Sequence, residues 1–144
     1  DWPIIIMLAA MIPIGTALQT SGLSEVISSN ISVLAVDMNL VWLVFLILII
    51  TMATTDIINN AATAGIIAPI SAGMGVELGY AIEPFLMVVA VGASCAFLTP
   101  IGHQCNTVVM GPGNYKFTDY WRLGLPLDIL IIAVSIPMIL FVWT

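Results

Sequence analysis

The fold is decided by residues 54–70, which read TTDIINNAATAGIIAPI. The chain is strongly apolar before this stretch, from Leu40 onward, and becomes apolar again after Asn60. Two apolar arms joined by a short polar segment are typical of two helices that pack side by side. We therefore predict a helical hairpin over residues 38–76, with the polar residues at its tip.

The composition excludes a water-soluble protein. The 144 residues are 61% hydrophobic and only 7% charged, whereas a soluble domain carries roughly 25% charged residues. The mean hydropathy is +1.18. With only two Lys and Arg residues in all, the chain lacks the basic surface of a nucleic-acid-binding protein. We predict a single all-α membrane domain over residues 1–144, surrounded by a lipid bilayer.

The depth of the hairpin tip has two interpretations. Two full spans of about 20 residues each need nearly all of residues 38–76 and leave the asparagines at a membrane face. Two shorter arms form a re-entrant hairpin, whose irregular backbone is tolerated at mid-depth only beside protein or a water-filled cavity. The polar cluster is wider than a turn requires, which favours the re-entrant hairpin.

A second polar interruption follows a helix that we expect at Pro84–Ala96. The interruption, residues 99–107, reads TPIGHQCNT. Pro100 removes a helical N–H donor, and Gly102 lowers the cost of leaving helical geometry. The polar side chains of this run are expensive against lipid. We predict a transmembrane helix over residues 83–114 that is broken at its centre.

The remaining segments are simpler. Residues 2–24 and 123–143 are uncharged or nearly so and are expected to be ordinary spanning helices. Residues 25–37 are shorter, with apolar side chains on one helical face, which indicates a helix lying at the membrane interface.

The orientation follows from the basic residues, which both lie in the loop over 114–123 (Lys116 and Arg122). The positive-inside rule places this loop in the cytoplasm and the C-terminus outside. We expect the plasma (inner) membrane as the location.

Two polar interruptions inside apolar helices are the architecture of secondary transporters, in which half-helix ends face anionic substrates and unwound carbonyls hold a coupling cation. The second arm of the hairpin begins at Ala61, so its free backbone N–H groups and positive helix end point into the tip. Asparagine supplies both an amide donor for an anion and a carbonyl oxygen for Na+. The sequence therefore favours secondary active transport of a small anion.

The hairpin tip resembles that of the divalent-anion/sodium symporters, the solute carrier family 13-like permeases of the ion transporter superfamily. In that family an acidic residue precedes a Ser-Asn-Thr signature and a proline closes the arm, as Asp56, Asn60 and Pro69 do here. Residues 93–106, with GPG at 111–113, resemble the broken tenth helix of the family. The resemblance covers nearly the whole chain but only the C-terminal half of a family member. It implies an N-terminal half that completes an inverted repeat, and a homodimer.

The resemblance also implies roles for individual residues. Asn60 matches the signature asparagine, which contacts both the substrate carboxylate and a sodium ion. The residues implied for the coupling Na+ are Thr55, Asn59, Asn60, Gly102 and Gln104. The residues expected to contact the anion are Asn59, Asn60, Ala61, His103, Asn106 and Thr107. Asp56 is expected to support the site or to carry a proton. No organic cofactor is expected.

Three departures from the family pattern leave the substrate open. Asn59 replaces the signature serine, Ala61 replaces the signature threonine, and His103 stands where dicarboxylate carriers have a threonine. A dicarboxylate, sulfate or a similar small oxyanion are all consistent with this site.

Other functions also stay open. They are a proton-coupled carrier, an arsenite- or citrate-type carrier of the same superfamily, and a structural subunit whose Asn and His side chains bond neighbouring helices. An enzyme is not expected, because neither Gly-x-Ser-x-Gly nor His-Glu-x-x-His occurs.

Overall fold

The computed structural model describes residues 38–144 continuously. Of residues 1–37 it describes Ile6, Ala9, Pro13, Thr16, Ala17, Thr20–Leu23, Val26, Ile27, Ser29 and Asn30. The spanning helix expected at 2–24 and the interfacial helix expected at 25–37 therefore lie largely outside the described residues. The side chain of Gln104 also lies outside them.

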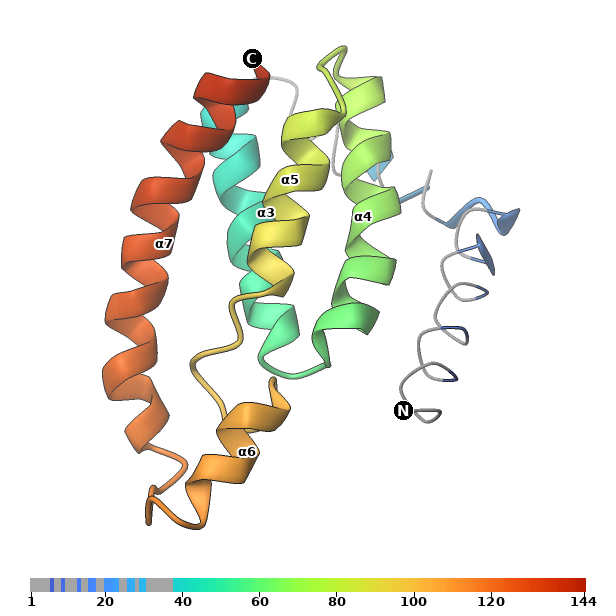
Figure 1. Ribbon diagram of the computed structural model, residues 1–144. Coiled ribbons are helices and arrows are strands. Elements are labelled where there is room, and N and C mark those ends of the chain that lie inside the picture. Colours follow the sequence, from blue (N-terminus) through green and yellow to red (C-terminus); the bar gives the residue numbers. More distant parts are fainter. Residues whose placement is uncertain are drawn as a thin grey trace.

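Every regular element in the described part of the chain is an α-helix. These helices are α3 (Leu40–Thr55), α4 (Asn60–Glu77), α5 (Glu83–Ala93), α6 (Gln104–Met110) and α7 (Asp119–Trp143). Helices α3, α4, α5 and α7 run side by side as a bundle, and α6 lies beyond one end of it (Figure 1). The all-α architecture agrees with the predicted class.

Helices α3 and α4 form two antiparallel arms joined by a short turn (Figure 1). Helix α3 begins after Asn39, whose side-chain oxygen accepts a hydrogen bond from Val41 N at 3.4 Å. Helix α4 begins in the same way after Asn59, whose side-chain oxygen accepts from Ala62 N at 2.8 Å. Asparagine is favoured there because it satisfies a backbone N–H that has no partner inside the helix. The first asparagine of the tip therefore starts the second arm.

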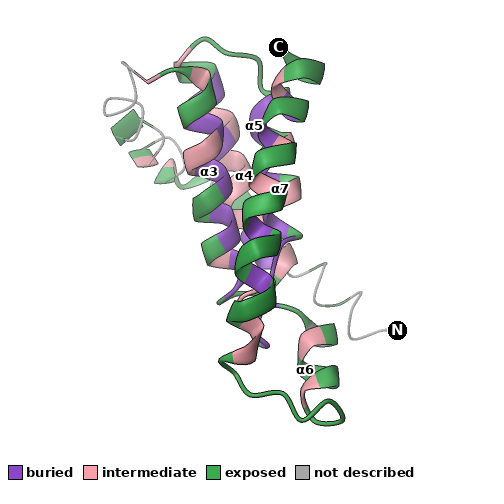
Figure 2. Cartoon of the chain, turned by 90° about the vertical axis from the view of Figure 1, so that its left-hand side faces the viewer, coloured by how far each residue is buried: buried purple, intermediate pink, exposed green. Residues whose placement is uncertain are grey.

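The core lies where α5 packs against α3 and α4, and where α7 packs against α3 and α5. Figure 2 shows the buried residues on the inner faces of these helices. The Ser71 hydroxyl adds a buried hydrogen bond to the Phe85 carbonyl at 3.0 Å, which joins α4 to α5. The main cluster consists of Leu43, Val44, Ile47, Leu48, Met52, Met74, Phe85, Val88, Val89, Cys95, Ile136 and Ile139.

Helix α7 is, within the described residues, the one helix long and apolar enough to cross a membrane. It begins at Asp119, earlier than the expected start at 123, and continues through Pro126 and Pro137. Its outward face exposes large apolar side chains, among them Leu123, Ile129, Leu130, Val134, Met138 and Phe141. A helix that is apolar on its outer face as well as its inner face is typical of a membrane span.

The interruption between α5 and α6 lies earlier than the sequence predicted. Helix α5 ends at Ala93, before the expected end at Ala96, and α6 already begins at Gln104. The intervening residues 94–103 are not helical. Helix α6 starts where it does because His103 accepts a hydrogen bond from Cys105 N at 3.2 Å and so caps its first turn.

Candidate functional site

The turn between α3 and α4 contacts the unwound segment between α5 and α6. We call this contact the tip–break junction and define it by residues 55–60 and 94–103. The Asp56 carboxylate accepts a hydrogen bond through Oδ1 from Leu98 N at 3.0 Å. The Thr99 hydroxyl donates to the Asp56 carbonyl at 2.6 Å. Two segments far apart in the sequence therefore form one polar junction.

Gly102 lies directly against the tip. A β-carbon at this position would lie 2.7 Å from the Thr55 carbonyl oxygen, 2.7 Å from Ala96 Cβ and 3.1 Å from Asp56 Cα. These separations are too short for non-bonded atoms, so the close approach of the two backbones requires glycine. The Thr99 hydroxyl also accepts a hydrogen bond from Gly102 N at 3.2 Å, which holds the glycine in place.

Several oxygen atoms gather around Thr55. The Thr55 hydroxyl lies 2.8 Å from Asn60 Oδ1 and 3.0 Å from the Ala93 carbonyl oxygen, and it donates its single hydrogen within this group. Thr55 is completely buried, and Asn60 is half-buried. Hydroxyl, amide and carbonyl oxygens are the ligands that hard cations prefer. The structure therefore brings together three of the residues expected to hold Na+, namely Thr55, Asn60 and Gly102.

The other two tip residues belong to the start of α4. Asn59 is exposed, and its side-chain oxygen is bonded to Ala62 N rather than to the group around Thr55. Ala61 lies in the first turn of α4. The first N–H groups of a helix have no intrahelical partner and carry the positive end of the helix dipole. This terminus has the chemistry of an anion-binding site.

Two polar side chains of α6 are engaged within the break. The Asn106 amide donates to the Ala96 carbonyl at 2.8 Å and to the Thr99 carbonyl at 3.1 Å. The Thr107 hydroxyl donates to the Pro100 carbonyl at 2.6 Å. Unwinding leaves these carbonyls without helical partners, so the two side chains satisfy them. Asn106 and Thr107, expected to contact the anion, hold the shape of the break in this structure.

His103 and Gln104 mark the point where the break ends. His103 is exposed and caps α6 through Nδ1. Gln104 contributes the first residue of α6, and its side chain lies outside the described residues. Within the described residues, the His103 side chain makes its hydrogen bond to α6 and none to the tip.

The bonds of Asn106 lead to a stability prediction. Asn106→Asp replaces the side-chain NH2 group, which donates to both carbonyls, by a single oxygen that faces them as an acceptor. We expect the free energy of unfolding to fall by about 1–3 kcal/mol, because the part-buried Ala96 and Thr99 carbonyls lose their donor. The measurement is the midpoint of thermal unfolding of the purified protein in detergent. Asn114→Asp, the same change in an exposed turn with a positive φ of 51°, should leave the midpoint unchanged; equal effects would contradict the assigned role.

Asp128 is a buried acid that sequence reasoning missed. It lies within the segment 123–143, which we expected to be an ordinary span, and its side chain is only 8% exposed. Its Oδ1 atom is buried without a hydrogen-bond partner in the described structure, as are Asp56 Oδ2 and the Thr63 hydroxyl. An ionisable residue in an apolar helix is itself a functional signal, and this one was readable in the sequence.

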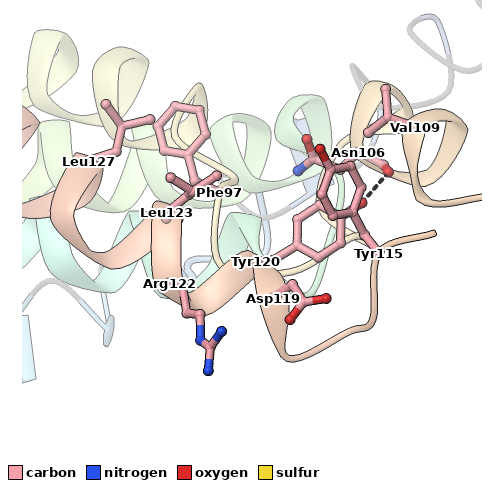
Figure 3. A pocket seen from close by; sticks show the side chains of 10 residues that line it. Phe97, Asn106, Val109, Tyr115, Asp119, Tyr120, Arg122, Leu123 and Leu127 are labelled. Carbon is pink, nitrogen blue, oxygen red and sulfur yellow. Dashed lines mark hydrogen bonds between the residues drawn. The ribbon is translucent and has the colours of Figure 1, made fainter. Parts of the chain in front are cut away.

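A cavity of about 520 Å³ lies between α6 and the first turns of α7 (Figure 3). The Tyr120 hydroxyl at its edge donates to the Asn106 carbonyl at 2.6 Å, which links α7 to α6. The cavity therefore borders the break from the side of α6, and its lining does not include the tip. The lining residues are Phe97, Asn106, Val109, Tyr115, Asp119, Tyr120, Arg122, Leu123, Gly124 and Leu127.

An apolar, all-helical chain whose polar groups gather where a hairpin tip meets a broken helix belongs to the class of secondary membrane transporters. Sequence comparison identifies the family within this class. The family model described as "Sodium:sulfate symporter transmembrane region" matches residues 1–144. The chain belongs to this family, which confirms the expected kinship with the divalent-anion/sodium symporters. It is a family of integral membrane transporters and not of enzymes.

Individual relatives support the same assignment. The chain is 36% identical over 138 residues to the transporter YfbS of Escherichia coli, covering 96% of this chain and 23% of YfbS. It is 28% identical over 142 residues to the sodium-dependent dicarboxylate transporter SdcS of Staphylococcus saprophyticus, covering 97% and 27%. It is 27% identical over 136 residues to the sodium-dependent high-affinity dicarboxylate transporter 3 of Caenorhabditis elegans, covering 92% and 24%. The chain thus spans about a quarter of the length of these relatives.

Proposed function

We propose that this chain is part of the C-terminal half of a secondary active anion symporter coupled to Na+. The tip–break junction would form its half of the binding site. One observation carries the proposal: the backbone of Gly102 touches Thr55, whose hydroxyl meets the amide oxygen of Asn60. Junctions of a hairpin or half-helix with unwound backbone are where secondary transporters bind their ions.

The proposed sodium site takes oxygen atoms from Thr55, Asn60 and Gly102. The donor set fits the ion, because it consists of hydroxyl, amide and carbonyl oxygens. Asn59 supports the site by starting α4 and so orienting Asn60, and Gln104 supports it from the first turn of α6. Bound Na+ supplies a positive charge that favours an anion nearby.

The proposed substrate is a small anion, either a dicarboxylate, sulfate or a similar oxyanion. It would lie against Asn60 and the first turn of α4, where the backbone N–H of Ala61 belongs to the positive end of the helix. His103 is exposed at the start of α6 and is available for a hydrogen bond to the same anion. Asn106 and Thr107 contribute by holding the break around the anion.

The structure supports a re-entrant placement of the hairpin. Helix α3 has 16 residues, which is about 24 Å at 1.5 Å per residue, against roughly 30 Å of hydrocarbon. The tip also stops short of the end of the molecule where the loop between α6 and α7 lies (Figure 1). We therefore propose that the tip ends inside the membrane. From the family resemblance we also propose that the N-terminal half of the transporter completes the site. The same resemblance leads us to propose a homodimer.

We propose the plasma (inner) membrane as the location. The loop over 114–123 carries Lys116 and Arg122 and lies at the opposite end of the bundle from the C-terminus (Figure 1). The cytoplasm would therefore hold this loop, and the C-terminus would lie outside.

The proposed function is tested by uptake into liposomes that contain the full-length transporter. Radiolabelled sulfate and succinate are supplied in turn, with an inward Na+ gradient or with choline in its place. A tenfold Na+ gradient coupled one to one supports about tenfold accumulation, because each tenfold ratio is worth about 1.4 kcal/mol. Uptake driven by a pH gradient and indifferent to Na+ would show a proton-coupled carrier instead. No uptake of any anion, including arsenite and citrate, would favour the structural subunit.

A further inference from the structure

The described residues include two buried carboxyl groups that are not ligands of the proposed sodium site. Asp56 is 5% exposed and Asp128 is 8% exposed. Asp56 Oδ2 and Asp128 Oδ1 are both buried without a hydrogen-bond partner in the described structure. A buried carboxylate oxygen without a partner is expensive, because nothing replaces the water that it loses.

The two carboxyl groups approach the same part of the break from different elements. Asp56 reaches it from the tip, since its Oδ1 accepts a hydrogen bond from Leu98 N at 3.0 Å. Helix α7 reaches it at Gly124, where a β-carbon would lie 2.5 Å from the Phe97 carbonyl oxygen. Asp128 follows Gly124 by one helical turn, so it lies on the same face of α7.

Both acids thus lie beside one segment of the break, Phe97 and Leu98, which Asp56 reaches from the tip and α7 reaches through Gly124. They form one buried cluster there. Two carboxylates in one buried cluster repel each other when both are ionised.

No basic side chain of the sequence neutralises this cluster. The only Lys and Arg residues are Lys116 and Arg122, and both are exposed near the loop that precedes α7. A buried charge that has no partner strongly destabilises the folded protein, and the cost is greater inside a bilayer. The charge of the two carboxyl groups must therefore be balanced by bound protons or by a bound cation.

We propose that Asp56 Oδ2 and Asp128 Oδ1 together bind a Na+ ion, at a site separate from the one formed by Thr55, Asn60 and Gly102. One ion shared by the two oxygens replaces their mutual repulsion by attraction to a common charge. Carboxylate oxygens are ligands that hard cations favour. Through the two carboxylates, the bound ion would link α7 to the tip. The choice of Na+ as the cation rests on the proposed function.

The test is equilibrium binding of radiolabelled Na+ to the full-length transporter in detergent, which requires no transport. Asp128→Asn keeps the size of the side chain and removes its charge. We expect it to bind about one sodium ion fewer per protomer than the unmodified protein. Asp119→Asn, the same change at the start of the same helix, should bind the full number. An unchanged number in Asp128→Asn would overturn the proposal.

Asn60→Ala separates this inference from the proposed function. Asn60→Ala removes a ligand of the first site and is expected to retain the ion at Asp56 and Asp128. The double variant Asn60→Ala with Asp128→Asn should then bind neither ion. If the unmodified protein binds Na+ and Asn60→Ala alone removes all of it, the inference fails while the proposed function stands. If the unmodified protein binds no Na+, both fail.

Thermal unfolding supplies a measurement that does not need Asp128→Asn to fold. In the Asn60→Ala protein, NaCl should still raise the unfolding midpoint relative to choline chloride at equal ionic strength, because an ion that binds only the folded state stabilises it. The absence of any sodium-specific rise would overturn the second site. Where Asp128→Asn does fold, its midpoint without Na+ should equal or exceed that of the unmodified protein, because one of two repelling charges is gone.

Discussion

Replacement of Asn60 by alanine is expected to abolish sodium-stimulated anion uptake. The Asn60 amide oxygen lies 2.8 Å from the Thr55 hydroxyl, at the point where Gly102 brings the break against the tip. Loss of groups that merely orient metal ligands costs about 10–100-fold in affinity. We therefore expect apparent Na+ affinity to fall at least about 100-fold when a proposed ligand is removed. The measurement is the initial uptake rate as a function of Na+ concentration in liposomes.

The matched control for Asn60 is Asn39→Ala at the start of the same hairpin. Asn39 is exposed and caps α3 by accepting a hydrogen bond from Val41 N at 3.4 Å. Losing this cap should cost roughly 0.5–2 kcal/mol of stability without changing the Na+ dependence of uptake. If Asn39→Ala and Asn60→Ala reduced uptake equally, Asn60 would have no more than a structural role.

Gly102→Ala is expected to disrupt the tip–break junction itself. Its new methyl group would lie 2.7 Å from the Thr55 carbonyl oxygen, a backbone atom that cannot rotate away. Overpacking of this kind costs roughly 1–3 kcal/mol. The tip and break should separate, so we expect a lower unfolding midpoint and loss of sodium-stimulated uptake together. Both are measured on the purified full-length transporter, in detergent and in liposomes respectively.

Gly65→Ala provides the control for Gly102, because a β-carbon at Gly65 meets nothing within 4 Å. Alanine there should stabilise α4 by roughly 0.4–1 kcal/mol, since it restricts the unfolded chain and fits the helix. Normal uptake by Gly102→Ala would contradict a close approach of the two backbones. Loss of uptake in Gly65→Ala would show that any added methyl group impairs the transporter.

The main elements of the fold could be predicted because they follow from local composition. The apolar arms on either side of residues 54–60 predicted two helices, and the run with Pro100 and Gly102 predicted a break. The limits of the break could not be predicted. They depend on which side chains satisfy the freed backbone groups, and these are Asn106 and Thr107, bonded to carbonyls several residues away.

The candidate site was predictable only in part. The motif around Asn60 indicated the family, and comparison confirmed it across residues 1–144. The sequence did not show that Asn59 caps α4 while Asn60 contacts Thr55, because asparagine is equally suited to a helix cap or to a ligand role. We overlooked Asp128 because it lies in an otherwise apolar helix. Its proposed role in cation binding depends on Asp56, which is distant in the sequence.

The sequence by itself determined that this chain is a membrane protein of helices with two polar interruptions, because charge, hydropathy and helix-breaking residues are local properties. Only the tertiary structure decided that the interruptions meet. Gly102 rests on Thr55, Thr99 bonds the Asp56 carbonyl, and Gly124 brings α7 against the Phe97 carbonyl of the break. These contacts join residues far apart in the chain, and close packing of the helices around the core selects them from many pairings that composition alone allows.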